Sequence, residues 1–262
     1  MDDYTRERVT ENLDVRVIGR DLRWHDTLPS TNSLAMHLAE TGAPEGTVVI
    51  AEEQSAGRGR RGREWVSPRG GIWLSVILRP GFETSHVPLI ALAASVAAAR
   101  AIRESTGLQA GVKWPNDVLV GGAKAVGILA ETGPGAAWVV VGIGINVNVP
   151  RALLPADARY PATSLAERAG SPVDRVRLTR TLLGELDKAY AMLGTEGGAA
   201  AVLRDWRGLS ETLGQMVRVE GDACGFEGRA TDVDSDGALL VRLPGGRIER
   251  VLAGDVTVRG SE

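Results

Sequence analysis

The sequence predicts an α/β (α+β) protein in which a sheet flanked by helices is followed by a small β-barrel. Residues 46–53 and 71–79 are short β-rich runs, and the second is apolar on both faces, as in a central strand. Residues 86–106 are rich in alanine and leucine and predict a long buried helix. From residue 213 onward the pattern changes to short β runs separated by turn residues, which is typical of a small barrel.

The remaining elements of the larger part follow in chain order. Residues 21–27 predict a strand, and residues 31–40 predict a helix that Ser30 caps. Apolar residues at helical spacing in 173–193 predict an amphipathic helix with Lys188 on its exposed side. Residues 199–206 predict one more short helix. Four further strands are expected at 109–113, 117–120, 125–131 and 137–146.

The barrel is expected to contain four strands with Gly-containing turns between them. The predicted strands are 216–220, 226–233, 239–243 and 248–252. We therefore divide the chain into a larger domain, 1–210, and a small C-terminal β-barrel domain, 211–262.

Composition restricts the class of protein. The net charge of −3 gives no general reason to expect nucleic-acid binding. The chain contains no signal core and no apolar stretch of about 18 residues, the length of a membrane span, so we expect a cytoplasmic protein without membrane contact. The single cysteine, Cys224, excludes an internal disulfide, and no His/Cys cluster has the spacing of a zinc site.

The segment from Gly57 to Arg63 contains four arginines and three glycines. Mutual repulsion and glycine freedom predict a loop that is mobile unless a polyanion binds it. Its guanidinium groups suit a triphosphate or a phosphodiester, and Trp65 could stack on a base or lie in the core. A solvated surface loop is the alternative, but the position between two central strands favours a ligand site.

Two lysine-containing segments form a second candidate site. Lys113-Trp114-Pro115-Asn116-Asp117 presents a cation, an amide and a carboxylate at a bend, which suits nucleotide phosphates and Mg²⁺. An Asn-Asp turn with a structural salt bridge is equally compatible with this spacing. Lys124 begins an apolar run, where a lysine usually marks an exposed strand end. However, of 30 Lys plus Arg residues only three are lysines, which favours a functional role for the compact cation of Lys124.

Two further motifs have a structural and a functional interpretation. Gly142-Ile-Gly-Ile-Asn146 lacks the third glycine of a dinucleotide-binding fingerprint, and no helix start follows it. Its glycines are expected to permit close packing in a central strand, with Asn146 as an amide donor to a ligand. Ser30, Thr31 and Asn32 are first an N-terminal helix cap, and their polar groups would also suit a cyclic urea.

Taken together and in order, these motifs closely resemble the motif series of biotin protein ligases. The series is Ser30-Thr-Asn, Gln54 with Gly57-Arg-Gly-Arg-Arg-Gly-Arg-Glu-Trp65, Lys113-Trp-Pro-Asn-Asp, Lys124-Ala-Val-Gly-Ile-Leu-Ala-Glu and Gly142-Ile-Gly-Ile-Asn-Val-Asn. The resemblance spans roughly residues 20 to 259. It implies a mixed sheet flanked by helices, similar to the class II aminoacyl-tRNA synthetase core, followed by an SH3-like barrel.

The resemblance also implies a role for each matching residue. Arg58 and Lys124 would be catalytic, Lys124 lying near the biotin carboxylate, and Asp117 would be a Mg²⁺ ligand. The other implied biotin-binding residues are Ser30, Thr31, Asn32, Gln54, Gly57, Gly59 and Arg60. The implied ATP-binding residues are Arg60, Arg63, Trp65, Lys113, Asn116 and Asn146.

The implied reaction uses ATP and Mg²⁺ to convert the substrate biotin into biotinyl-5'-adenylate. The biotinyl group then passes to a lysine of the biotin carboxyl carrier domain of a carboxylase. Members of the family that double as repressors carry an N-terminal helix-turn-helix domain, and the roughly 20 residues before the first predicted strand cannot hold one. We therefore expect no nucleic-acid partner. A homodimer is a hypothesis, because related enzymes pair through sheet edges.

Two alternatives remain open. A lipoate or octanoate ligase of the same superfamily would need an apolar tunnel and fewer polar groups, so the set formed by Ser30, Thr31, Asn32 and Gln54 argues against it. A non-catalytic biotin-sensing regulator belongs to a different class. The retained arginines and lysines, and the missing helix-turn-helix, argue against that.

Overall fold

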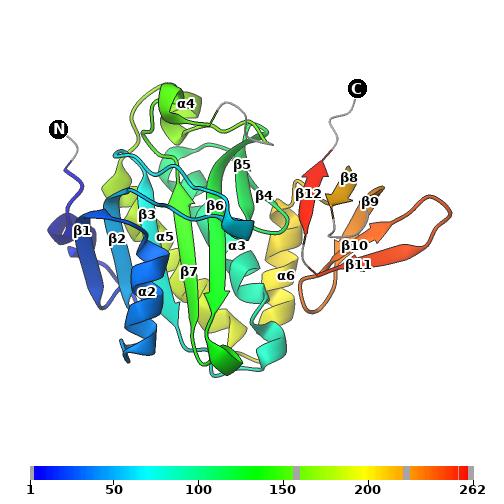
Figure 1. The fold of residues 1–262 in the computed structure, drawn as a ribbon, viewed down its shortest axis with the longest axis horizontal. Coiled ribbons are helices and arrows are strands. Elements are labelled where there is room, and N and C mark those ends of the chain that lie inside the picture. The colour runs from blue at the N-terminus through cyan, green and yellow to red at the C-terminus, as the bar shows by residue number, and fades with distance from the viewer. Residues whose placement is uncertain (1–2, 156–159, 221–224, 253, 259–262) are drawn as a thin grey trace.

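The computed structural model describes residues 3–155, 160–220, 225–252 and 254–258, so Cys224 lies outside the described residues. It contains two sheets (Figure 1). The first has seven strands, in spatial order β1 (Leu22–Leu28), β2 (Val48–Gln54), β3 (Ile72–Leu78), β7 (Val139–Ile145), β6 (Ala123–Thr132), β5 (Asp117–Val120) and β4 (Ala110–Lys113). Strand β1 is parallel to β2 and the other neighbours are antiparallel. The sheet is therefore mixed, as the resemblance implied.

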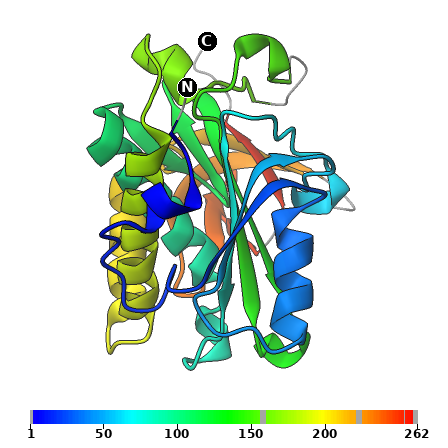
Figure 2. The same cartoon turned by 90° about the vertical axis from the view of Figure 1, so that its left-hand side faces the viewer.

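Helices cover both faces of this sheet. The helices are α1 (Arg6–Thr10), α2 (Thr31–Glu40), α3 (Leu89–Thr106), α4 (Leu165–Ala169), α5 (Arg175–Leu193) and α6 (Gly198–Leu209). Helix α2 packs on β2, β3 and β7, whereas α3 packs on β4 to β7 from the opposite side and is itself covered by α5 and α6. Figure 2 shows the sheet edge-on between these two helical layers. Single 3₁₀ turns lie at Arg60–Gly62, Thr84–His86, Pro134–Ala136 and Arg151–Leu153.

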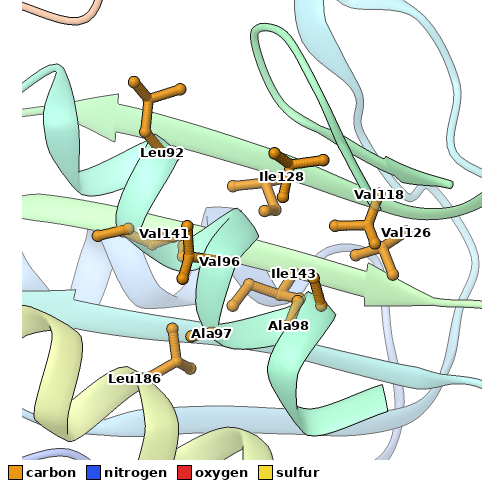
Figure 3. Packing of buried hydrophobic residues seen from close by; sticks show 14 of the residues in the cluster. Leu92, Val96, Ala97, Ala98, Val118, Val126, Ile128, Val141, Ile143 and Leu186 are labelled. Carbon is orange, nitrogen blue, oxygen red and sulfur yellow. The ribbon is translucent and has the colours of Figure 1, made fainter. Parts of the chain in front are cut away.

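The main core lies between the sheet and α3. Because side chains alternate along a strand, β7 directs Val141 and Ile143 toward α3, and β6 directs Val126 and Ile128 the same way (Figure 3). The other face of β7 packs on α2 through Val140. By the same alternation, the glycines of β6 and β7 point to the α2 face, where they leave space above the strands.

The second sheet has five antiparallel strands. In spatial order they are β11 (Ile248–Val251), β10 (Leu239–Arg242), β9 (Phe226–Val233), β8 (Met216–Glu220) and β12 (Asp255–Val258). Strands β8 and β9 have the predicted bounds, and β12 was not predicted. The Trp114 indole N–H donates to the carbonyl of Gly237 at 3.0 Å, and Arg207 donates to Asp232 at 2.6 Å. These bonds tie the second sheet to the first sheet and to α6.

The predicted helices 173–193 and 199–206 correspond to α5 and α6, whose bounds differ by a few residues, while one predicted helix start is wrong and two short helices were missed. Helix α3 begins at Leu89 rather than at residue 86, with Pro88 just before its first residue. Proline has no backbone N–H to donate within a helix and is best tolerated at a helix start, so α3 begins beside Pro88 instead of running through it. Helices α1 and α4 were missed because each has only five residues, too few for a visible apolar period. No helix in the described part of the chain is long and apolar enough to cross a membrane.

Candidate active site

A cavity of about 740 Å³ lies on the α2 side of the sheet, which is the size of a small-molecule site. Every predicted site residue except Gly57 lines it: Ser30, Thr31, Asn32, Gln54, Arg58, Gly59, Arg60, Arg63, Trp65, Lys113, Asn116, Asp117, Lys124 and Asn146. Segments more than 100 residues apart in the sequence thus meet at one place. Val256 of β12 also lines the cavity, so the second sheet closes part of its rim.

The floor of the cavity consists of strand glycines. A Cβ atom at Gly142 would lie 2.0 Å from Oδ1 of Asn32, and one at Gly144 would lie 2.4 Å from Nε1 of Trp65. A Cβ at Gly127 would lie 2.8 Å from Cζ3 of the same indole. Close approach to a central strand was predicted for the motif at 142–146, and the structure shows that the approaching groups are side chains of the site itself.

A polar cluster at the start of α2 forms one end of the cavity. Ser30 caps the helix as predicted, accepting from the amide of Ser33. The backbone N–H and the hydroxyl of Thr31 lie 2.8 and 3.1 Å from Oε1 of Gln54, and Nε2 of Gln54 donates to Ser67 at 2.8 Å. Each Gln54 amide atom therefore has a partner of defined polarity, which fixes the orientation of its side chain.

Asn32 connects this cluster to a residue that the sequence did not single out, Glu131 on β6. Oδ1 of Asn32 accepts from the Ser75 hydroxyl at 2.5 Å, and Nδ2 donates to Oε2 of Glu131 at 2.9 Å. The other carboxylate oxygen of Glu131 pairs with the guanidinium of Arg58. Alternation from Gly127 would have predicted that Glu131 lies on the α2 face of β6, the face on which the cavity lies.

The segment 57–65, which we call the arginine loop, folds over the cavity. Its 3₁₀ turn, Arg60–Gly62, brings Nη1 of Arg60 to 3.2 Å from Oδ1 of Asn116 and 3.4 Å from the carbonyl of Gly254. Burial lowers the pKa of Arg60, Asp117 opposes this change, and the neighbouring cations Arg61 and Arg63 add to it. The guanidinium nonetheless stays charged, since its ordinary pKa is so high.

Gly57 does not line the cavity, in contrast to the prediction. It is buried, its carbonyl accepts from the amide of Trp65 at 2.9 Å, and a Cβ there would lie 2.3 Å from the Trp65 carbonyl. Gly57 therefore allows the two ends of the arginine loop to approach each other and acts on the cavity only through the loop.

The two lysines of the site share one carboxylate. Nζ of Lys124 lies 2.6 Å from Oδ1 of Asp117, and Nζ of Lys113 lies 3.6 Å from Oδ2. The ammonium group of Lys124 also lies 5.1 Å from the centre of the Trp65 ring. The salt-bridge and ligand-binding interpretations of this motif are compatible, because both lysines line the cavity while pairing with Asp117.

Asn146 holds the segment at 163–165 in place through two hydrogen bonds. Its side chain is buried, and Nδ2 donates to the carbonyl of Thr163 at 3.1 Å. The backbone carbonyl of Asn146 accepts from Leu165, the first residue of α4, at 2.8 Å. Both bonds hold the chain that brings Tyr160 and Ala162 to the cavity wall. In the structure, Asn146 thus shapes the wall of the cavity that it lines.

Comparison with known proteins agrees with this geometry. Residues 24–148 match the biotin/lipoate A/B protein ligase family, and residues 212–259 match the biotin protein ligase C-terminal domain. The bifunctional ligase/repressor BirA of Bacillus subtilis is 38% identical over 93% of this chain and 76% of its own length. The biotin–[acetyl-CoA-carboxylase] ligase of Mycobacterium tuberculosis is 35% identical over 96% of this chain and 97% of its own.

Solved structures show the same fold. The biotin protein ligase from Aquifex aeolicus in complex with biotin and ATP superimposes with a TM-score of 0.80 at 28% identity, covering 92% of this chain and 100% of that one. The Leishmania major biotin protein ligase in complex with biotinyl-5-AMP has a TM-score of 0.64 at 25% identity, covering 89% and 99%.

The match over residues 24–148, which include most of the mixed sheet and of the cavity lining, assigns the chain to the biotin/lipoate ligase class. Within that class, the identities over most of both chains are to biotin ligases. The chain belongs to the biotin protein ligase family.

Proposed function

We propose that this protein activates biotin with ATP to biotinyl-5'-adenylate and then transfers the biotinyl group to a lysine of a biotin carboxyl carrier domain. One observation carries the proposal: a single cavity combines an amide and hydroxyl cluster, an indole ring and two cations, Arg58 and Lys124. The cluster suits the polar biotin head, the indole suits the adenine, and the cations suit the anions that react between them. We place the proposed reaction in the cytoplasm, where ATP and carboxylases are found.

In the first proposed step, a biotin carboxylate oxygen attacks the α-phosphorus of ATP. A C(O)O–P bond forms, the bond between the α-phosphorus and the bridging oxygen breaks, and pyrophosphate leaves. Both reactants are anions, so Arg58 and Lys124 would lower their repulsion and hold them in line. In the second step, the acceptor amine attacks the acyl carbonyl, AMP leaves, and the amine loses a proton.

The arginine loop would exclude water from the mixed anhydride between these steps. Arg60 links the loop both to Asn116 and to the carbonyl of Gly254, so the closed loop spans the first domain and the second sheet. Such closure preserves a hydrolysable intermediate until the acceptor arrives.

The expected Mg²⁺ ligand does not fit a resident metal site. Asp117 is paired with two ammonium groups, and the described residues contain no cluster of three or more His, Cys, Asp or Glu side chains that could hold a metal. Mg²⁺ commonly arrives on nucleotide phosphates with few protein ligands. We therefore assign it to the substrate Mg·ATP and give Asp117 no metal-binding step.

The proposed adenylation is reversible, which gives a direct test. We expect biotin-dependent exchange of labelled pyrophosphate into ATP, and in the Lys124→Ala variant an exchange rate about 100-fold lower, the usual cost of removing one electrostatic contact in such a site. Lys188→Ala is the matched control because that side chain is 74% exposed and pairs with Glu185.

Three outcomes would count against the proposal. Exchange with lipoate or octanoate but not with biotin would favour a lipoate or octanoate ligase. Exchange with none of these acids would favour a non-catalytic regulator. Equal activity of the two lysine variants would remove Lys124 from the mechanism. Transfer to the carrier domain needs a separate assay, in which labelled biotin should become covalently attached to its lysine.

A further inference from the structure

Both cations assigned to the substrate anions are paired with carboxylates of the protein. Lys124 pairs with Asp117, which it shares with the buried Lys113, on the adjoining strands β5 and β6. Arg58 pairs with Glu131, and this pair joins the arginine loop to β6. A substrate anion that binds either cation must therefore compete with a carboxylate already in contact with it.

Of the two carboxylates, Glu131 is the more easily displaced from its cation by a ligand anion. The side chains of Arg58 and Glu131 are 43% and 23% exposed, whereas Asp117 is only 11% exposed and lies between two lysines. Solvent weakens a partly exposed ion pair, so a ligand anion can replace it at small cost. In addition, Arg58 lies on the loop and donates to the hydroxyl of Ser33 at 3.3 Å, a neutral contact that can persist while the carboxylate partner changes.

Glu131 is held beside the polar cluster at the start of α2 by a chain of hydrogen bonds. Its Oε2 accepts from Asn32 at 2.9 Å, Asn32 contacts Ser75 at 2.5 Å, and Ser75 lies 2.8 Å from the Thr31 hydroxyl. Because Ser75 and Asn32 are almost fully buried, this chain fixes where the carboxylate stands. Glu131 does not itself line the cavity, but its negative charge is thus fixed beside Asn32 and beside the Arg58 guanidinium that would bind the acid, and both of these residues do line it.

We propose that Glu131 is a positioning residue that competes with the carboxylate of the substrate for Arg58 and thereby lowers the affinity of the site for the free acid. The inference rests on the proposed function, because it takes the acid to be biotin. When the acid binds, its carboxylate takes over the guanidinium, and Glu131 keeps its bond from Asn32. Glu131 therefore lowers the affinity for a ligand with a negatively charged carboxylate but does not change the affinity contributed by the ligand's ring.

The test compares a charged ligand with a neutral one. Glu131→Gln removes the charge but keeps an oxygen that can accept from Asn32. We expect this variant to bind biotin about two- to fivefold more tightly, the range expected for a partly exposed ion pair. We expect no change for biotinol, in which a hydroxymethyl group replaces the carboxylate. Isothermal titration calorimetry of both ligands measures the difference.

Two further variants act as controls. Glu53→Gln removes a carboxylate charge from β2, where Oε2 of Glu53 lies 3.7 Å from Nε of Arg69. This variant should leave the Kd of both ligands unchanged. In an Arg58→Gln background, Glu131→Gln should no longer tighten biotin binding, because the contested cation is gone.

The outcomes separate this inference from the proposed function. If the wild-type protein binds neither ligand, the proposed function fails. If it binds both but Glu131→Gln does not tighten biotin, or changes biotin and biotinol equally, the competition is overturned and Glu131 acts only as a support for Asn32. Persistence of the tightening without Arg58 would also overturn it.

Discussion

The two faces of the strand pair β6 and β7 differ sharply in composition, because successive residues of each strand point to opposite faces. Toward α3 the strands present Val126, Ile128, Val141 and Ile143, each at most 2% exposed. Toward α2 they present Gly127, Gly142 and Gly144, together with Leu129, Glu131 and Val140. One face is a continuous packed core, whereas the glycines of the other face form the floor of the cavity, so a single pair of strands serves both stability and binding.

The glycine face is costly for the sheet. Glycine in a strand interior is less stable than alanine by roughly 0.5–1 kcal/mol, because more backbone freedom is lost. The opposite face compensates through close packing, and the close contacts of Asn32 and Trp65 with the strand need the missing side chains. If this separation is correct, substitutions on the two faces should affect different measurements.

The largest effect is expected on the core face. Ile145→Ala, on the same face of β7 as Ile143, should lower the free energy of unfolding by about 2–5 kcal/mol, because it removes a fully buried aliphatic side chain that does not line the site and leaves a void. Urea denaturation measures the loss, and biotin affinity at a temperature where the variant is folded should stay near the wild-type value. A large loss of affinity with little loss of stability would show that this face serves binding and not only the stability of the fold.

A smaller effect, and one confined to activity, is expected on the glycine face. The added Cβ in Gly144→Ala would lie 2.4 Å from Nε1 of Trp65 and must displace the indole. A displacement of about 1 Å at a reacting site can cost on the order of 100-fold in rate. Pyrophosphate exchange should fall by that order while the free energy of unfolding changes by less than about 1 kcal/mol, the size of a strand glycine effect.

Gly184→Ala in α5 is the matched control for this variant. Nothing lies within 4 Å of a Cβ at Gly184, so the exchange rate should be unchanged and stability should rise slightly, as alanine favours a helix. Unchanged exchange in Gly144→Ala would show that the glycine is dispensable and that Trp65 tolerates movement.

The smallest effect concerns the loop that covers the glycine face. Four arginines in residues 58–63 are trypsin sites, and glycine freedom together with mutual repulsion favours early cleavage there. A saturating biotinyl-adenylate analogue should slow this cleavage several-fold by adding an anion that the loop can bind. Cleavage at Arg247, which is 74% exposed on the second sheet, should not change. Equal cleavage rates with and without the analogue would show that the loop is not a ligand-gated lid.

Local signals in the sequence were enough for much of the fold. The helix 31–40 and the strands 216–220 and 226–233 have the predicted bounds because a cap residue, turn residues and alternation mark their ends. Strand β12 escaped prediction, since its four residues depend on pairing with β8, more than 30 residues away in the chain. Helix α4 was missed because it has only five residues, and its first amide donates to the carbonyl of Asn146, which lies outside the helix.

For the site, the chain itself determined which chemical groups are present. The ordered motifs identified the arginines, lysines, amides and hydroxyls that the structure brings to one cavity, with Gly57 as the exception. Only the tertiary structure decided their partners. The pairing of Arg58 with Glu131, the sharing of Asp117 by two lysines, and the contact of Asn32 with Gly142 each join residues from different elements. Local sequence patterns report the conformation of neighbouring residues, whereas these contacts arise from the register and packing of strands that are distant in the chain.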